Sequence, residues 1–212
     1  MAVDLGKMAD LLIAGKVEDV SSMVQEAIDA GMESQEILQS GLIAGMDVVG
    51  QRFKACEMFI PEVLRSAKAM SKGMEKLRPL LIESGATMAG TFVIGTVKGD
   101  LHDIGKNLVG MMFEGAGFKV VNLGIDLDTQ VFVDAVKEHK PDLLGMSALL
   151  TTTMPKMGEV INALKEAGIR DQVKVMIGGA PVTAEFAKEI GADVYGANAG
   201  SSVDKAKEVL AA

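Results

Sequence analysis

The sequence predicts an α/β protein in which an amino-terminal four-helix bundle is followed by a doubly wound, five-stranded parallel sheet. Apolar residues recur at helical spacing up to about residue 84, and short β-branched runs alternate with amphipathic segments from residue 91 onward. A stretch of small residues separates the two regions. We therefore predict a helical domain over 1–84, a linker over 85–90 and an α/β domain over 91–212.

The amino-terminal region contains four segments that carry an apolar stripe. Gly15 and Gly31 end the first two segments, Ser34 begins the third, and Pro61 lies in the first turn of the fourth. A connector over 54–60 joins the third segment to the fourth. Because short connections favour packing between neighbouring amphipathic helices, the pattern predicts a four-helix bundle.

The carboxy-terminal region contains five pairs of a strand-like run and a helix-like segment. The predicted strands, each with the helix that follows it, are 91–97 and 104–115, 119–122 and 129–139, 143–147 and 154–166, 173–177 and 183–190, and 194–195 and 203–210. Strands that alternate with helices form parallel sheets, since each helix carries the chain back across the sheet. Ligands of such sheets bind beyond the carboxyl ends of the strands, so the loops there form the candidate site.

The composition limits the classes of function. A net charge of −8 and a pI near 4.9 argue against nucleic-acid binding, which requires a basic face. No apolar run approaches the ~20 residues of a membrane span, and no signal-peptide pattern precedes the first helix. The single cysteine, Cys56, fits a reducing cytoplasm. One cysteine and two histidines are too few for a structural zinc site, so we expect any metal to arrive within a cofactor.

The loop after the first predicted strand carries the most informative residues. Asp100 and His102 are two positions apart, so in extended backbone their side chains project to the same side. A carboxylate that accepts the Nδ1 proton of an imidazole leaves Nε2 as a lone-pair donor to a metal. Gly105 leaves space in which a large flat ligand can approach the backbone. Taken alone, the loop also fits an ordinary turn with Asp103 as a helix cap.

The other loops contribute hydroxyl groups and small residues. Segment 147–153 has four hydroxyl groups around three apolar residues, segment 178–179 is a glycine pair, and segment 196–201 contains mostly small residues. Each alone fits turns and helix caps, but together they line one edge of the sheet with space for a long ligand. The first loop lacks the glycine pattern of a dinucleotide site, and its aspartates disfavour a phosphate.

The motif Asp-x-His-x-x-Gly over 100–105, followed by Ser-x-Leu over 147–149 and Gly-Gly at 178–179, resembles a known binding motif. It resembles the cobalamin-binding motif of methionine synthase and of the corrinoid proteins of methyltransferase systems, in the same order and spacing. Segment 59–64 also resembles the helical cap of that family, so the resemblance covers essentially the whole chain. It implies a Rossmann-like, or flavodoxin-like, cobalamin-binding domain behind the cap.

The resemblance also implies roles for single residues. His102 matches the residue that replaces the cofactor's own dimethylbenzimidazole as the lower ligand of cobalt, and Asp100 would hydrogen-bond it. Thr153 stands where methionine synthase has the serine that completes a proton-relay trio, so these three are the predicted catalytic residues. The loops after the later strands would hold the displaced nucleotide tail. The predicted cofactor-binding residues are Gly99, Asp100, Leu101, His102, Asp103, Ile104, Gly105, Ser147, Leu149, Thr151, Gly178, Gly179 and Ala199.

The helical domain would cover the upper, methyl-bearing face of the cofactor. The candidate residues for this cover are Phe53, Phe59 and Leu64, although core packing explains them equally well. Such a cap must swing aside for each partner, so we expect the linker to act as a hinge.

The family resemblance implies a methyl carrier. Cob(I)alamin would take a methyl group from a substrate on one methyltransferase, and methylcobalamin would give it to a second, which passes it to tetrahydrofolate or a thiol. A reductive activator is a further expected partner. No substrate-binding barrel is present, so we expect no methyl-donor activation by the chain alone, and its standing as an enzyme stays open. Methyl ethers, methanol, methylamines and betaines all remain possible donors, with general likeness favouring an O-demethylase system.

Two other classes of protein share parts of this pattern. A cobalamin-dependent mutase subunit would have the sheet and the Asp-x-His loop, but is not expected to carry a four-helix cap. A cobalamin-sensing regulator would have both domains and would also need a DNA-binding segment, which this acidic chain does not supply. The methyl carrier is therefore the predicted function.

Overall fold

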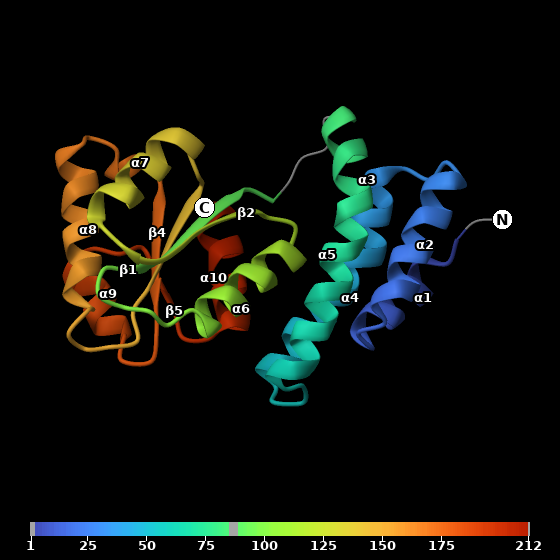
Figure 1. Ribbon diagram of the computed structural model, residues 1–212, viewed down its shortest axis with the longest axis horizontal. Coiled ribbons are helices and arrows are strands. Elements are labelled where there is room, and N and C mark those ends of the chain that lie inside the picture. Colours follow the sequence, from blue (N-terminus) through green and yellow to red (C-terminus); the bar gives the residue numbers. More distant parts are fainter. Residues whose placement is uncertain (1–2, 85–88, 212) are drawn as a thin grey trace. The chain divides into compact units, whose positions relative to one another are not determined.

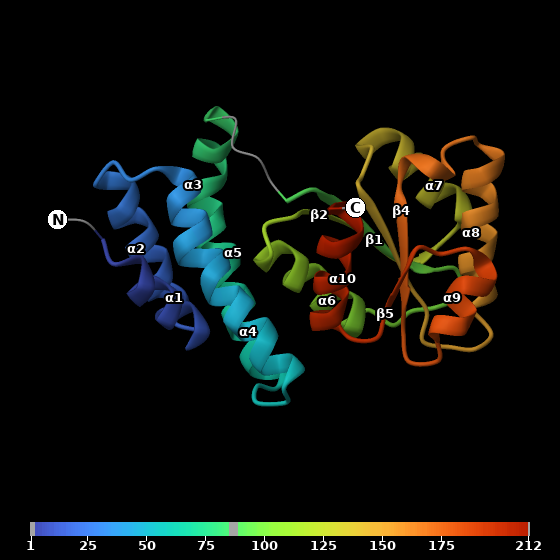
Figure 2. The same cartoon turned by 180° about the vertical axis from the view of Figure 1, so that it is seen from behind.

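The computed structural model describes residues 3–84 and 89–211, which belong to two compact units. One unit consists of Met1–Ala89 together with Glu114–Gly117, and the other of Gly90–Phe113 with Phe118–Ala212. The linker predicted over 85–90 falls mostly on residues 85–88, which lie outside the described residues. Figures 1 and 2 show the helices and strands of each unit from two sides.

The first unit is helical. Its elements are α1 (Leu5–Ile13), α2 (Val17–Asp29), the continuous stretch of α3 (Ser34–Glu36), η1 (Ile37–Ile43) and α4 (Ala44–Lys54), and α5 (Ile60–Glu83). Apolar side chains from each part of the bundle are fully buried, among them Leu12, Val24, Leu42, Val63 and Leu77. Helix α2 lies against α5, and α1 lies against α4, which confirms the predicted bundle of four helical segments.

The third predicted helix has an irregular middle. Residues Ile37–Ile43 (η1) form a π-helix, which is wider than an α-helix, between α3 and α4. Glycines let η1 and the start of α4 approach α1 closely: a Cβ at Gly41 would lie 2.7 Å from Met8 Sδ, and one at Gly45 would lie 3.1 Å from Ala9 O. The apolar spacing predicts the helix but does not distinguish its π-helical segment from α-helix.

The second unit is a parallel α/β sheet. Its elements are β1 (Thr91–Val97), α6 (Ile104–Gly115), β2 (Lys119–Leu127), α7 (Thr129–His139), β3 (Leu143–Ser147), α8 (Pro155–Glu166), η2 (Arg170–Gln172), β4 (Lys174–Gly178), α9 (Ala184–Ile190), β5 (Val194–Gly196) and α10 (Ala199–Ala211). The strands are parallel in the order β2-β1-β3-β4-β5. Helices α6 and α10 cover one face, and α7, α8 and α9 cover the other (Figures 1 and 2). The predicted doubly wound, five-stranded sheet is confirmed.

Strand β1 lies inside the sheet and is covered on both faces. Val93 and Val97 belong to the buried cluster that includes side chains of α7 and α8. On the other face, the Phe92 ring stacks on the Phe113 ring of α6 with a centroid distance of 4.0 Å. A nearly continuous apolar run is typical of a strand that is buried in this way. The loop that follows β1 therefore starts from a fixed position.

The predicted end of the second strand was wrong. That strand was predicted over 119–122, but β2 continues to Leu127. Its pairing with β1 shifts register, and Gly124 lies in the left-handed region with φ +98°. A glycine in a strand often marks a bulge rather than an end, and this one allows the strand to continue.

The start of the last helix was also predicted too late. The expected helix covered 203–210, whereas α10 begins at Ala199. The side chain of Asn198 accepts a hydrogen bond from the backbone N–H of Ser201 at 2.9 Å, in the manner of a helix cap. The small residues that predicted a loop are therefore partly helical.

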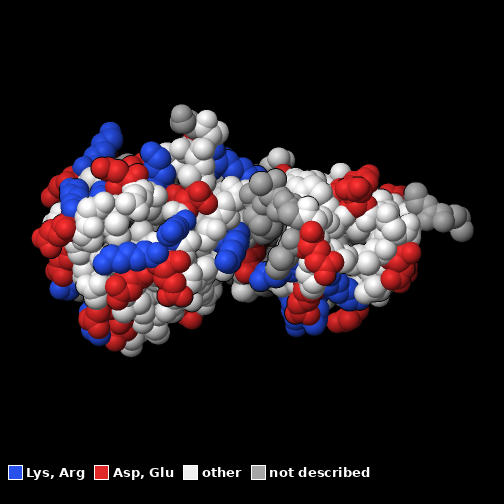
Figure 3. Space-filling model, turned by 90° about the horizontal axis from the view of Figure 1, so that it is seen from above, with Lys and Arg blue, Asp and Glu red and all other residues white. Residues whose placement is uncertain are grey.

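Charged side chains of both signs are intermixed on the face of the molecule shown in Figure 3. Ion pairs within a single helix include Lys156 with Glu159 on α8 and Lys72 with Glu75 on α5, each at 2.8 Å. Among the helices that the structure describes, none combines the length and the apolar character that a membrane crossing requires.

Candidate functional site

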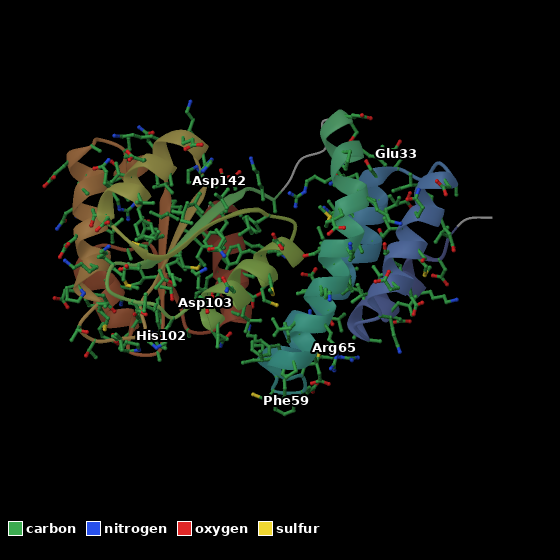
Figure 4. The ribbon with its side chains drawn as sticks, viewed as in Figure 1. Glu33, Phe59, Arg65, His102, Asp103 and Asp142 are labelled. Carbon is green, nitrogen blue, oxygen red and sulfur yellow. The ribbon has the colours of Figure 1, made fainter. Side chains whose placement is uncertain are left out.

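The candidate site lies beyond the carboxyl ends of β1 and β3. From β1 the chain moves to β2 on one side and then returns to β3 on the other, so the direction of winding changes between β1 and β3. Such a switch point is the usual ligand site of an open α/β sheet. Figure 4 shows His102 and Asp103 at this end of the sheet, and Asp142, which precedes β3, at the opposite end.

Asp100 is the centre of the site, and its side chain is fully buried. Its Oδ1 atom accepts the backbone N–H of His102 at 3.1 Å and lies 2.7 Å from Nδ1 of the same residue. Its Oδ2 atom accepts the backbone N–H groups of Leu149 at 2.7 Å and Leu150 at 3.3 Å, and the Thr153 hydroxyl at 2.9 Å. One carboxylate therefore joins the loop after β1 to the loop after β3.

The hydrogen bonds to Asp100 determine its charge. Burial alone would raise its pKa, but the hydrogen bonds from the Leu149 N–H, from His102 and from the Thr153 hydroxyl outweigh this effect and hold the pKa well below its usual range. Asp100 is therefore ionised near neutral pH. Since a carboxylate can only accept, Nδ1 of His102 carries the proton in this contact. In the neutral ring, Nε2 is then a free lone-pair donor.

Several apolar side chains near His102 in sequence, or on the loop after β3, are exposed to solvent. The His102 side chain is 51% exposed. Large apolar residues on the two loops are also exposed, by 40 to 74%; they are Leu101, Ile104, Leu149 and Leu150. At Gly105, an added Cβ would meet no atom within 4 Å, so the surface at the start of α6 is open. Apolar surface and open space on loops that also carry a free ring nitrogen suit a large, flat ligand that binds through a metal.

The remaining predicted residues of the β1 and β3 loops have different environments. Gly99 adopts φ +82° and donates its N–H to Asp126 Oδ1 at 2.8 Å. Ser147 is half-buried at the end of β3, and Thr151 is exposed in the loop that follows. Ala199 is buried at the start of α10. Of the predicted catalytic residues, the structure brings all three together through Asp100.

Contacts within the protein explain why glycine occupies both positions of the pair at the end of β4. A Cβ at Gly179, where φ is +134°, would lie 1.8 Å from Ala148 O, and one at Gly178 would lie 3.0 Å from Gly196 O. The Gly178 carbonyl also accepts the N–H of Ala148 at 3.2 Å. Close approach between the ends of β3, β4 and β5 is therefore enough to require glycine here. The predicted role of the pair in making room for the nucleotide tail stays a prediction.

A polar network beside the site was not predicted. Lys106 is buried in the first turn of α6, and its Nζ donates to Asn107 Oδ1 and to Asn122 Oδ1, both at 2.7 Å. Asn122 Nδ2 also donates to Asn107 Oδ1 at 3.0 Å. Burial lowers the pKa of the Lys106 ammonium, against the opposing effect of Asp103. The network links the start of α6 to β2, so it fixes the end of the loop that carries His102. The one sequence feature that could have indicated it is the asparagine within the apolar run of β2.

Asp126, at the end of β2, fixes the start of the same loop and was also not predicted. It has φ +55°, accepts the Gly99 N–H at 2.8 Å, and donates its own N–H to the carbonyl of Asp100 at 3.1 Å. The hydrogen bond from Gly99 lowers the pKa of Asp126. Lys98 lies 3.6 Å from its carboxylate. Because the strand was predicted to end before it, this contact could not be anticipated.

We expect Thr153→Val to lower the free energy of unfolding by about 1 to 2 kcal/mol, because the variant removes a buried hydrogen bond to a charged group. Thr153 is buried, and its hydroxyl contacts both Asp100 Oδ2 and Leu150 O at 2.9 Å. Urea denaturation of the cofactor-free protein measures the effect. Thr153→Ser keeps the hydroxyl and should retain most of the stability. A valine variant as stable as the wild type would show that the hydroxyl contributes nothing.

Comparisons with known proteins agree with this geometry. The B12 binding domain matches residues 90–204, and a second model of the same description matches residues 5–78. The chain is 45% identical over 208 residues to trimethylamine corrinoid protein 1 of Methanosarcina acetivorans, covering 97% of this chain and 96% of the relative. It is also 45% identical over 208 residues to the dimethylamine corrinoid protein of Methanosarcina barkeri, covering 98% and 97%. In the crystal structure of the methanol:cobalamin methyltransferase complex MtaBC from Methanosarcina barkeri, one chain matches with TM-score 0.86 and 35% identity, over 96% of this chain and 78% of that one.

The fold and these matches define a cobalamin-binding protein with an α/β domain and a helical domain. The chain belongs to the B12-binding domain family, and its cofactor is cobalamin. Within that family, it resembles corrinoid proteins of methyltransferase systems over nearly its whole length. The residues present fit this cofactor, because His102 is half exposed with Nδ1 held by Asp100, and the same loops carry exposed apolar side chains and the open position Gly105. The predicted family and cofactor are confirmed, and these relatives do not favour the mutase or regulator alternatives.

Gly105→Ala tests whether the open space at α6 is used by the cofactor. Because no protein atom lies within 4 Å of the added Cβ, we expect the cofactor-free protein to fold as stably as the wild type. We expect the affinity for cobalamin to fall roughly tenfold, which corresponds to about 1.4 kcal/mol of overpacking. Absorption titrations with cobalamin measure the affinity. Gly158→Ala on α8, where the added Cβ would lie 3.5 Å from Ile190, is the control, and an unchanged affinity of Gly105→Ala would contradict the prediction.

Proposed function

We propose that this protein is a methyl carrier, which holds cobalamin through His102 while methyl groups pass between two methyltransferases. The observation that carries the proposal is the free Nε2 of His102, whose ring is oriented by the buried Asp100 carboxylate at 2.7 Å. The family match and the named relatives support the same function.

In this proposal the protein binds and orients, and the cofactor carries the chemistry. When bound, cobalamin supplies a cobalt centre that can accept and release a methyl group. Asp100 holds the proton on Nδ1 and thereby presents Nε2 to the open side of the site. Thr153 and two backbone N–H groups keep Asp100 ionised and in place. The exposed apolar side chains of the two loops would exclude water from the surface that the cofactor covers.

We further propose that the methyl donor is a methylamine. Two relatives at 45% identity are named for trimethylamine and dimethylamine, whereas the methanol complex contains a chain at 35% identity. The expected O-demethylase system has no support among these three proteins. The proposed partners are a methyltransferase specific for the amine, a second methyltransferase for the acceptor, and a reductive activator. The proposed location is the reducing cytoplasm, which the single cysteine supports.

Methyl transfer to the cobalamin-loaded protein tests the proposal. The protein is reconstituted, reduced and mixed with trimethylamine, dimethylamine or methanol and the methyltransferase specific for each, and the absorption of the cofactor is followed. We expect methylation with an amine and its methyltransferase, and none when the methyltransferase is omitted. Methylation only in the methanol mixture would overturn the choice of donor. A loaded protein that is methylated in no mixture would overturn methyl transfer from amines and from methanol, the donors named for these relatives.

A further inference from the structure

Thr96 is a polar residue in the apolar strand β1, and its side chain is fully buried. Val93 and Val97 of this strand face the cluster that includes α7 and α8, so the alternation of a strand places Thr96 on the α6 face. There its hydroxyl donates to the backbone carbonyl of His102 at 3.0 Å. A buried hydroxyl needs such a partner, and this one lies six residues further along the chain.

The carbonyl that Thr96 contacts lies just before helix α6. The first hydrogen bond that leads into the helix comes one residue later, where Asn107 N–H donates to Asp103 O at 2.7 Å. Thr96 therefore donates to a carbonyl group that lies one residue before the first carbonyl in this helical pattern. A side chain of β1 thus binds the loop backbone directly.

His102 needs this second attachment because its other contacts meet at one point. Its backbone N–H and its Nδ1 atom both contact Oδ1 of Asp100, at 3.1 and 2.7 Å. Both bonds end on the same oxygen, so they hold the amide and the ring but not the carbonyl side of the residue. The bond from Thr96 holds that carbonyl side.

We propose that Thr96 is a positioning residue for the cobalt ligand, since its hydroxyl fixes the backbone of His102 and leaves only the ring free to turn. This inference rests on the proposed function, in which His102 binds cobalt. Its consequence is that the imidazole binds or leaves the metal by rotation of the ring, while the loop over 98–103 stays in place. Because the backbone is fixed, the ring brings Nε2 back to the same position each time it binds the cofactor.

Thr96→Val tests the proposal in the cobalamin-loaded protein. The variant keeps the shape of the side chain and removes the hydroxyl. EPR spectra of the Co(II) form distinguish molecules that show coupling to a ligand nitrogen from molecules that do not. We expect the ratio of the first kind to the second to fall about fivefold. This factor corresponds to one net hydrogen bond of about 1 kcal/mol. Thr96→Ser should restore the ratio, and Thr91→Val, at the other end of the same strand, should leave it unchanged.

Amide hydrogen exchange of the cofactor-free protein gives a second readout. Thr96→Val should speed exchange at His102 and Asp103 about fivefold and leave the amides of Val93 and Ile94 unchanged. If the valine chain does not fold, Thr96→Ala removes the same hydroxyl without a second methyl group. Unchanged exchange in the loop, or an unchanged EPR ratio in a folded variant, would overturn the proposal. A wild-type protein without nitrogen coupling would instead overturn cobalt ligation by His102, and the exchange measurement would still decide whether Thr96 anchors the loop.

Discussion

Replacing His102 by alanine is expected to abolish nitrogen coupling in the EPR spectrum of the Co(II) form, while the cofactor-free chain stays folded. The ring is 51% exposed, so its removal leaves no cavity in the core. The backbone bonds of the residue, to Asp100 and from Thr96, do not involve the ring and can persist. Because the ring is half exposed, losing its Nδ1 contact to Asp100 should lower the free energy of unfolding by only about 1 kcal/mol.

The measurement compares absorption and EPR spectra of the reconstituted wild type and the variant. His139→Ala is the matched control, because His139 is the other histidine of the chain and lies at the end of α7. The control should keep the coupling. Coupling that persists in His102→Ala would mean that another nitrogen, such as the cofactor's own base, binds the metal.

Asp100→Asn is expected to destabilise the cofactor-free protein by about 3 kcal/mol, the cost of leaving buried donors without an acceptor. The carboxylate accepts from His102 on one oxygen and from Leu149 and Thr153 on the other. An asparagine supplies one oxygen only, and its amide group would point N–H groups at donors. Urea denaturation at neutral pH measures the loss. Asp126→Asn, at an exposed carboxylate that accepts one backbone N–H, should show a much smaller effect.

The difference in stability between the wild type and Asp100→Asn should also depend on pH. The pKa of Asp100 is lowered in the folded state, so folding favours its ionised form. The stability that this carboxylate contributes is therefore complete above its unfolded pKa, about 3.9, and is lost as the pH falls toward the lower folded value. We expect the difference in unfolding free energy between wild type and Asp100→Asn to be constant from about pH 7 to pH 5 and to shrink below about pH 4. A difference that does not change down to pH 3 would contradict this assignment.

Local sequence patterns were sufficient to predict the limits of two strands that are buried on both faces. Strands β1 and β3 have the limits predicted for them, because each is a short apolar run bounded by polar or turn residues. Strand β2 lies at the edge of the sheet, and none of its residues is fully enclosed. Its apolar run is therefore less regular, and the bulge at Gly124 resembles a turn in the sequence.

The site was predictable only in part. The spacing of Asp100 and His102 predicts their contact, since both lie in one short loop. The contact of Thr153 with Asp100 spans 53 residues and could be expected only from the family resemblance. Thr96, Lys106 and Asp126 are visible as polar residues, but their partners are set by how the strands and α6 meet. No local spacing contains that information.

The two oxygens of Asp100 serve different parts of the site: within the described residues, Oδ1 accepts hydrogen bonds from His102 and Oδ2 accepts them from the loop after β3. A carboxylate shares one negative charge between its oxygens, so a stronger pull on one weakens the other. Any shift of Leu149 or Thr153 toward Oδ2 therefore draws electron density away from the imidazole. In the proposed carrier, the strength with which His102 donates to the metal would thus depend on Leu149, 49 residues beyond Asp100, without any change in the histidine itself.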